Sequence, residues 1–181
     1  MPALVLVVAA VAALLAGCSS TVSMTPAKAA NDPACAAVTV RLPDSVDGQS
    51  RRWTDAQATG AWGDPATVLV TCGVAERGPS TLPCDTRAGV DWLIDDSDAP
   101  HYRFTTFGRS PAVEVYLDYD EVSGSQVLTD LGPAVGQLPT TGATCTSIVV
   151  SWAAAANADR YRVEEDAAGS WTTLAASHAT T

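Results

Sequence analysis

The stretch Ala112-Val113-Glu114-Val115-Tyr116-Leu117-Asp118-Tyr119 alternates between apolar and polar side chains. A period of two places Val113 and Val115 on one face of a β-strand and Glu114 and Tyr116 on the other. A strand with one buried and one solvated face is typical of antiparallel sheets. We therefore expect a half-buried antiparallel strand here, with the other strands assembled around it.

Three further segments on the N-terminal side have the composition of strands. Residues 101–107 are joined to the first stretch by the turn Gly108-Arg109-Ser110-Pro111, and residues 89–94 come before them, across an acidic turn at 95–98. The third segment is the β-branched run 67–71. Together these segments predict a meander of four strands, which is close to the minimum for a stable sheet.

Helices are expected on both sides of the strand region in the sequence. Residues 123–138 have apolar side chains at helical spacing, with Pro133 as an interruption. Asp32-Pro33 fits an N-cap followed by the first helical residue, and this helix would run to about Leu42. The β-branched residues 38–40 leave a strand open as an alternative.

These segments predict the fold class α+β. We expect a small antiparallel sheet of about four strands, one or two helices packed on it, and disulfide bonds. Residues 43–65 are rich in polar residues and glycine. They are expected to form an ordered loop with some helix, held by Trp53 and Trp62.

The N-terminus carries the features of an exported lipoprotein. Residues 4–16 are uncharged and long enough for a signal-peptide core, but shorter than the roughly 20 residues that span a bilayer. Ala16-Gly17-Cys18 resembles a bacterial lipobox, which implies cleavage before Cys18 and acylation of its sulfur. The first three residues lack the usual positive charge, which a start site chosen too far downstream would explain, and a buried N-terminal helix is the alternative.

We accordingly divide the chain into four parts. Residues 1–18 are expected to be a lipoprotein signal peptide ending in the lipobox cysteine, and residues 19–34 a flexible tether. Residues 35–145 form the main domain, and residues 146–181 a C-terminal strand pair. Two acyl chains on Cys18 would hold the protein stably on the outer face of the cell membrane, whereas without acylation it would be secreted.

The remaining cysteines suggest an oxidising compartment. Four of them follow Cys18, an even number in a chain expected to be exported, and they are Cys35, Cys72, Cys84 and Cys145. Four cysteines allow three connectivities, and the sequence does not choose among them. Our preferred assignment is Cys72–Cys84, closing the loop between them, with Cys35–Cys145 joining the ends of the domain.

The charge of the chain excludes one class of partner. The net charge is −10, and the longest run of basic residues is the pair Arg51-Arg52. Such a chain does not bind nucleic acid, since that requires many phosphate contacts from Lys and Arg. Anionic lipid would also repel it, so the expected membrane association is through the acyl anchor.

Several segments resemble a known family. Trp62-Gly63-Asp64-Pro65, Cys72-Gly73, Gly89-Val90-Asp91-Trp92 and, most specifically, Thr105-Thr106-Phe107-Gly108-Arg109 look like the domain of unknown function number 3515. This family consists of uncharacterised bacterial envelope lipoproteins and secreted proteins. The resemblance covers about residues 35–145 and implies one domain behind a lipobox, with no activity, ligand or catalytic residue to carry over.

The tail differs in character. Residues 147–152, 161–164 and 170–174 look like early strands of a fibronectin type III domain, but about 36 residues are too few for a sandwich of roughly 100. A truncated domain and an isolated strand pair both remain open, as does a partly helical middle. A weaker hypothesis assigns this tail an adhesion or carbohydrate-binding role.

Patterns for catalysis are sparse. No Gly-x-Ser-x-Gly motif and no metal-ligand spacing such as CxxC occurs, so we expect neither metal nor other cofactor. His101, at a strand start, fits a surface role better than that of a general base. Carboxylates cluster at 91–98 and 118–121, which leaves a carboxylate-based hydrolase of cell-wall polymers as the alternative function.

The expected function is therefore non-catalytic binding or scaffolding at the cell envelope. Arg109 on its tight turn suits bidentate capture of a carboxylate or phosphate, unless it pairs internally with a carboxylate such as Asp91. The other residues predicted to bind a partner protein or an anionic ligand are Arg51, Arg52, Trp53 and Trp62.

Overall fold

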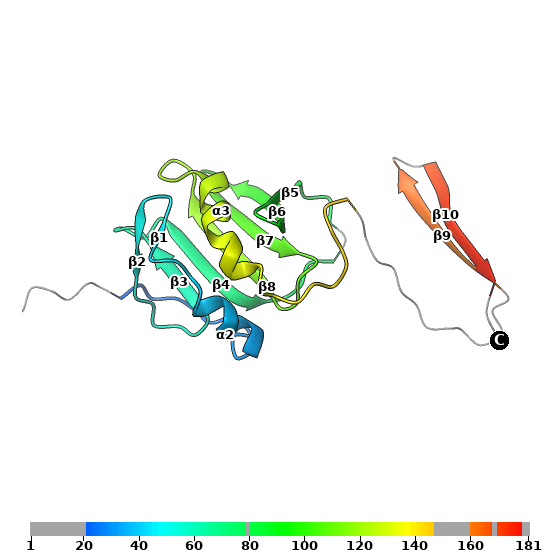
Figure 1. The fold of residues 1–181 in the computed structure, drawn as a ribbon. Coiled ribbons are helices and arrows are strands. Elements are labelled where there is room, and N and C mark those ends of the chain that lie inside the picture. Colours follow the sequence, from blue (N-terminus) through cyan, green and yellow to red (C-terminus); the bar gives the residue numbers. More distant parts are fainter. Residues whose placement is uncertain (1–20, 79, 147–159, 168–169, 179–181) are drawn as a thin grey trace, which may run out of the picture. The chain divides into compact units, whose positions relative to one another are not determined.

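The strand formed by Ala112–Asp118, β8, lies in the middle of the main sheet. Its core-facing side chains, Val113, Val115 and Leu117, are fully buried, while Glu114 and Tyr116 are half-exposed, as the alternation predicts. β8 pairs with β4 (Val68–Val74) on one side and with β7 (His101–Phe107) on the other. β8 is therefore hydrogen-bonded along both of its edges and lies among the central strands of the sheet (Figure 1).

The computed structural model describes residues 21–78, 80–146, 160–167 and 170–178. The main sheet has eight strands, all antiparallel, in the order β1-β2-β3-β4-β8-β7-β6-β5. The strands not yet introduced are β1 (Ser45–Val46), β2 (Gln49–Arg52), β3 (Thr59–Trp62), β5 (Cys84–Arg87) and β6 (Val90–Asp98).

The expected number of about four strands was too low. The four predicted strands are present as β4, β6, β7 and β8, but β1, β2 and β3 occupy the segment expected to be a loop, and β5 adds the far edge. The sequence Gln49-Ser50-Arg51-Arg52 shows no alternation. Such a strand forms because its neighbour already presents a hydrogen-bonding edge, so its own composition carries little signal.

The acidic segment Asp95–Asp98 is part of β6 and is not a turn. It pairs with β7 through Asp95↔Arg103 and, after a register shift, Asp98↔His101. The chain reverses instead at Ala99-Pro100. Asp96 and Ser97 form the bulge between these two pairs, and the side chains of Asp96, Ser97 and Asp98 are exposed to water.

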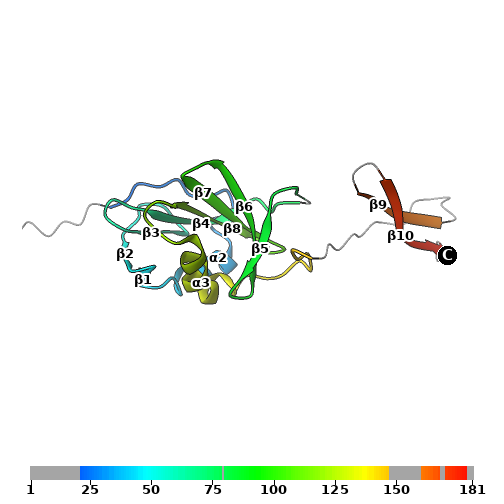
Figure 2. The same ribbon diagram turned by 90° about the horizontal axis from the view of Figure 1, so that it is seen from above.

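Two helices are present among the described residues, and they cover one face of the sheet (Figure 2). α2 (Pro33–Thr39) starts with Asp32 as N-cap, whose carboxylate accepts from the amide of Ala34, and with Pro33 in the first turn. The helix therefore prevails over the strand alternative, although it stops at Thr39 rather than near Leu42.

α3 (Gly124–Val135) begins after the N-cap Ser123 and buries Val127, Leu128, Leu131 and Val135. Pro133 does not interrupt it. The proline lies in the last turn with its ring exposed, so the helix loses one hydrogen bond and continues to Val135. The buried side chains of both helices and of the central strands form one hydrophobic core.

Two disulfides are formed, but with a connectivity different from the preferred one. Cys35 of α2 bonds Cys72 of β4, and Cys84 of β5 bonds Cys145 after α3. Cys72 cannot reach Cys84 because its side chain points into the core beneath α2, while Cys84 begins the opposite edge of the sheet. The fold decides this pairing, since β4 and β5 are separated by three strands.

The segment predicted to be a flexible tether is hydrogen-bonded to the domain at Val22 and again at Ala29. Val22 forms a parallel bridge with Thr54, and the amide of Ala29 donates to the carbonyl of Gly73. In Figure 2 this segment, in blue, crosses the face of the sheet opposite the helices. Its low hydrophobicity suggested a free linker, but main-chain hydrogen bonds do not depend on side-chain polarity.

The C-terminal residues form a second compact unit, residues 149–181. Its described part is an antiparallel pair of β9 (Arg160–Ala167) and β10 (Ser170–His178), with a register irregularity between Thr173 and Ala175. The predicted strand 147–152 and the signal peptide with Cys18 lie outside the described residues. Among the helices described, none is long and apolar enough to cross a membrane.

Candidate binding groove

A groove of about 670 Å³ opens beside β2, at the β1 end of the sheet. Its walls are Thr39 of α2, Asp44 and residues 51–54 and 56–59; we call it the Trp53 groove. Its volume falls within the roughly 300–1,000 Å³ typical of small-molecule sites. Three of the five residues predicted to bind a ligand, Arg51, Arg52 and Trp53, therefore meet at one place.

Arg51 supplies an exposed cation at the groove. Its backbone amide donates to the carbonyl of Asp44, and its Nη1 donates to the carbonyl oxygen of Leu42 over 2.9 Å. Within the described part of the chain, the Arg51 guanidinium forms this one hydrogen bond. The side chain is thus held at the groove while the group remains exposed.

Arg52 has a different role from its neighbour. Its Nη1 lies 2.7 Å from a carboxylate oxygen of Asp64 and donates to the carbonyl of Gly63 over 3.0 Å. The Arg52 side chain is 11 % exposed, so these contacts fasten β2 to the loop that follows β3. Arg52 therefore shapes the wall of the groove, and Arg51 is the cation open to a ligand.

Trp53 stands out among the described tryptophan side chains. Its side chain is 79 % exposed, whereas those of Trp62 and Trp92 are fully buried. Its backbone carbonyl accepts a 2.8 Å hydrogen bond from the amide of Val22, so the main chain is fixed although the indole is exposed. A large exposed aromatic ring on a fixed backbone is the kind of side chain that dominates binding interfaces.

Trp62 is not part of the groove, contrary to the expectation that it shares a surface with Arg51, Arg52 and Trp53. Its ring is fully buried, and its indole Nε1 donates to the carbonyl of Pro43 over 3.0 Å. The sequence could not tell the two tryptophans apart, because both lie in the same polar segment. The sheet separates them, placing Trp62 at the end of β3 and inside the core.

Arg109 lies at the opposite side of the domain. Its guanidinium donates to the carbonyl oxygens of Leu138 (2.8 Å), Gly89 (3.0 Å) and Gly136 (3.3 Å). Gly89 belongs to the turn between β5 and β6, at the far edge from β2. Arg109 thus joins the β7–β8 turn to the end of α3, a geometry that supports internal bonding over ligand capture.

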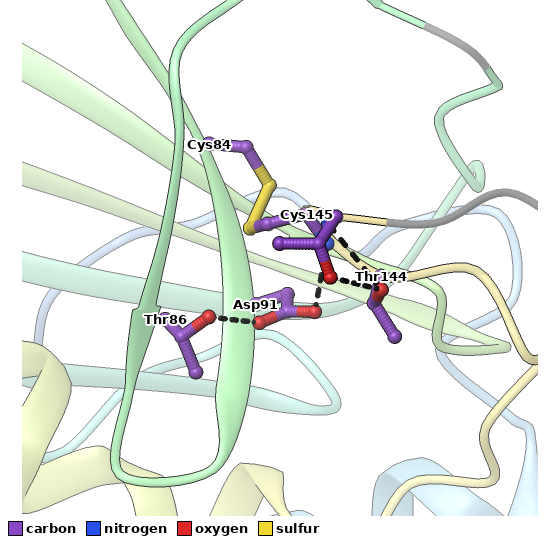
Figure 3. The surroundings of a disulfide bond; sticks show 6 residues. Cys84, Thr86, Asp91, Thr144 and Cys145 are labelled. Carbon is purple, nitrogen blue, oxygen red and sulfur yellow. Dashed lines mark hydrogen bonds between the residues drawn. A yellow bond between two sulfur atoms is a disulfide. The ribbon is translucent and has the colours of Figure 1, made fainter.

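Asp91, the carboxylate proposed as an internal partner of Arg109, is bound elsewhere. One of its oxygens accepts from the hydroxyl of Thr86, and the other accepts from the amide of Cys145 over 3.0 Å. Figure 3 shows the carboxylate between these two donors, next to the Cys84–Cys145 disulfide. Asp91 therefore holds the segment after α3 against the β5–β6 hairpin.

Members of the two acidic clusters meet at one end of β6, β7 and β8. Asp98 accepts a 2.8 Å hydrogen bond from the hydroxyl of Tyr116, and this bond raises the pKa of Tyr116. His101 stacks on Tyr116, with its Nε2 3.8 Å from Asp118. In the described part of the chain, no three His, Cys, Asp or Glu side chains are arranged to hold a metal ion.

The solvated face of the sheet carries an ion pair that the sequence analysis missed. Arg103 Nη1 lies 3.1 Å from Glu114, and its guanidinium stacks 4.5 Å from the Tyr116 ring centre. These residues line a smaller hollow of about 310 Å³ with Met24. The alternation placed Glu114 and Tyr116 on this face, but only strand pairing brings Arg103 opposite Tyr116.

A second hollow of about 210 Å³ adjoins the Trp53 groove. The two share Thr39, Gln57 and Ala58, and the second is also lined by Val40, which is 78 % exposed. Val40 follows α2 directly, so the helix end determines its exposure. Neither Val40 nor Gln57 has a sequence signal for binding, since an isolated Val or Gln in a polar segment is unremarkable.

Comparison with known proteins identifies the family of the chain. Residues 2–143 match a family described as a protein of unknown function, DUF3515. The chain belongs to the DUF3515 family. The match covers both the apolar N-terminal run and the domain that carries the Trp53 groove, so the DUF3515 region extends beyond the residues on which the resemblance rests. No curated protein and no solved structure matches this DUF3515 chain.

Proposed function

We propose that this DUF3515 protein is a lipid-anchored, non-catalytic binding module on the outer face of the cell membrane. The observation that carries the proposal is the Trp53 groove, which is lined by two exposed residues, Arg51 of β2 and Trp53 directly after that strand. Acylation of Cys18 supplies the anchor.

The chemistry of the groove defines what it would bind. Arg51 offers hydrogen-bond donors and a positive charge to a carboxylate or phosphate, and Trp53 offers a flat apolar surface next to it. Asp44 on the rim disfavours a ligand with several negative charges, because its carboxylate would repel a second anionic group. The favoured ligand is therefore partly apolar with one anionic group, borne by an envelope protein or by a smaller envelope component.

The disulfides support the compartment. Cys35–Cys72 and Cys84–Cys145 close sequence separations of 37 and 61 residues. Disulfides persist in oxidising compartments and are rare where thiols are kept reduced. The Cys35–Cys72 bond also ties α2, which supplies Thr39 to the groove wall, to the central part of the sheet.

The test is site-specific photocrosslinking in intact cells. A photoreactive amino acid replaces Gln57, an exposed residue of the groove wall, and a matched control replaces Arg87, an exposed residue of the edge strand β5. The proposal predicts a discrete crosslinked species from position 57 that is absent from position 87.

Variants then connect that species to the groove. Arg51→Ala and Trp53→Ala should each reduce it, since both remove exposed side chains, whereas Arg87→Ala should leave it unchanged. If position 57 gives no species beyond that of position 87, or if both groove variants leave it intact, the groove is not the binding site.

A further inference from the structure

The N-terminal segment is clamped to the chain next to Trp53. The amide of Val22 donates to the carbonyl of Trp53 over 2.8 Å, and the amide of Asp55 donates to the carbonyl of Val22 over 3.3 Å. The Asp55 carboxylate accepts from the hydroxyl of Ser23 and from the amide of Met24 at 2.9 and 2.8 Å. Four hydrogen bonds thus fix Val22, Ser23 and Met24 to the chain at Trp53 and Asp55, and we call this contact the clamp.

The distance from this clamp to Cys18 is short. Ser19, Ser20 and Thr21 separate Cys18 from Val22. Four residue steps span at most about 14 Å, even when fully extended. A lipid group on the Cys18 sulfur would therefore hold the clamp, and with it Trp53, within that distance of the membrane surface.

Trp53 has the side chain expected at such a position. Tryptophan is enriched at membrane–water interfaces, where its amphipathic ring lies at the level of the headgroups. Trp62 and Trp92 are in the core, whereas the exposed Trp53 is hydrogen-bonded through its backbone to Val22, four residues from Cys18. Packing within the domain does not explain an indole that is exposed to this extent, so its position points to a contact outside the domain.

We infer that Trp53 inserts into the headgroup region of the bilayer, so that the Trp53 groove opens onto the lipid surface. This inference rests on the proposed acylation of Cys18 and specifies the environment of the same groove. The partner that Trp53 contacts is lipid rather than a soluble protein, because the acyl anchor on Cys18 holds this side of the domain against the membrane.

The local charges indicate how this contact is made. Arg52 is paired with Asp64, and the Asp55 carboxylate is bound within the clamp, where those hydrogen bonds lower its pKa and keep it ionised. Arg51 is balanced by Asp44 on the same groove. The charges around Trp53 therefore nearly cancel, and the whole chain has a net charge of −10. Attraction to anionic lipid thus cannot drive the membrane contact, which depends on insertion of the indole.

The experiment uses the full-length processed protein purified from membranes and reconstituted into phosphatidylcholine vesicles. The lipids carry bromine near the top of their acyl chains, which quenches tryptophan at short range. The difference in emission between wild type and Trp53→Phe isolates the contribution of Trp53. We expect this contribution to be blue-shifted and quenched by brominated lipid, and to stay so in 1 M salt because it does not depend on screened charges.

A matched control moves the indole to the far edge of the sheet. Arg87→Trp in the Trp53→Phe background places an exposed tryptophan on β5, which should remain unquenched. Equal quenching at both positions would overturn the inference, because the domain would then have no fixed orientation. Loss of the Trp53 quenching in 1 M salt would also overturn it.

Mass spectrometry of the same sample distinguishes the two levels of the argument. An unquenched Trp53 in protein that carries acyl chains on Cys18 overturns the membrane contact and leaves the anchored binding module standing. A Cys18 without acyl chains overturns the anchor, and the membrane contact falls with it. Quenched Trp53 together with acylated Cys18 supports both.

Discussion

Replacing Arg109 with alanine should destabilise the domain, because this side chain bonds three carbonyl groups that no other described side chain reaches. Two of them, on Gly136 and Leu138, follow the C-terminal end of α3, and the third, on Gly89, belongs to the β5–β6 turn. The variant would leave all three to water. It would also remove a positive charge from the negative end of the helix dipole.

The size of the effect follows from the geometry. The bonds to Leu138 and Gly89 have ordinary lengths of 2.8 and 3.0 Å, while the 3.3 Å bond to Gly136 is weaker. A hydrogen bond from a charged donor contributes about 1.5–3 kcal/mol, which we reduce to about 1 kcal/mol each because Arg109 is half-exposed. The free energy of unfolding should therefore fall by about 2–3 kcal/mol, and Arg109→Lys should lose roughly half as much, because it keeps the charge but forms fewer bonds.

Urea denaturation followed by tryptophan fluorescence, under oxidising conditions, measures this change. With a denaturant slope of about 2 kcal/mol/M, the midpoint should fall by about 1–1.5 M. Arg87→Ala is the control, because the Arg87–Asp85 pair is more than 40 % exposed on both sides and contributes at most about 1 kcal/mol. If Arg109→Ala unfolds within about 0.5 kcal/mol of wild type, the bonding role assigned to Arg109 is wrong and ligand capture regains support.

Two further predictions concern the N-terminal segment. The bonds from Met24 and Ser23 lower the pKa of Asp55 in the folded state, so the clamp is fully formed above the unfolded pKa of about 4 and weakens as the pH falls through the folded pKa. Hydrogen-exchange protection of the Met24 amide, corrected for intrinsic exchange, should decrease over the same pH range. The Asp55→Asn variant should lack this pH dependence. At Gly73, with φ of +96°, a Cβ would lie 2.4 Å from the carbonyl carbon of Ala29, so Gly73→Ala should displace the N-terminal segment and accelerate tryptic cleavage after Lys28. The control Gly48→Ala, with φ of +76° and open space around it, should not accelerate this cleavage. Equal cleavage in both variants would contradict the close packing of Gly73 against Ala29.

Local patterns predicted the central elements well. The alternation in residues 112–119, the cap at Asp32-Pro33 and the apolar spacing of residues 123–138 each correspond to an element of the structure. Each pattern depends on residues close in sequence, and burial of one face follows from the element itself. The α+β class was therefore predictable, although the strand count was not.

The candidate site was predicted in part. Arg51, Arg52 and Trp53 are adjacent in sequence and were certain to be close in space. Whether each of them is open to a ligand depends on distant residues, since Asp64 and Gly63 engage Arg52 while Leu42 positions Arg51. Trp62 is excluded from the proposed surface for the same reason, because distant residues bury its ring in the core.

The sequence by itself determined the acidic charge, the even set of four domain cysteines, the central strand, the helix α3 and the family of this protein. Tertiary structure alone decided the disulfide pairing, the strands β1, β2, β3 and β5, and the separation of Arg109 from Arg51. The physical reason is range. Propensity and periodicity act over a few residues, whereas strand pairing and side-chain access are settled by groups tens of residues apart that meet only when the core closes.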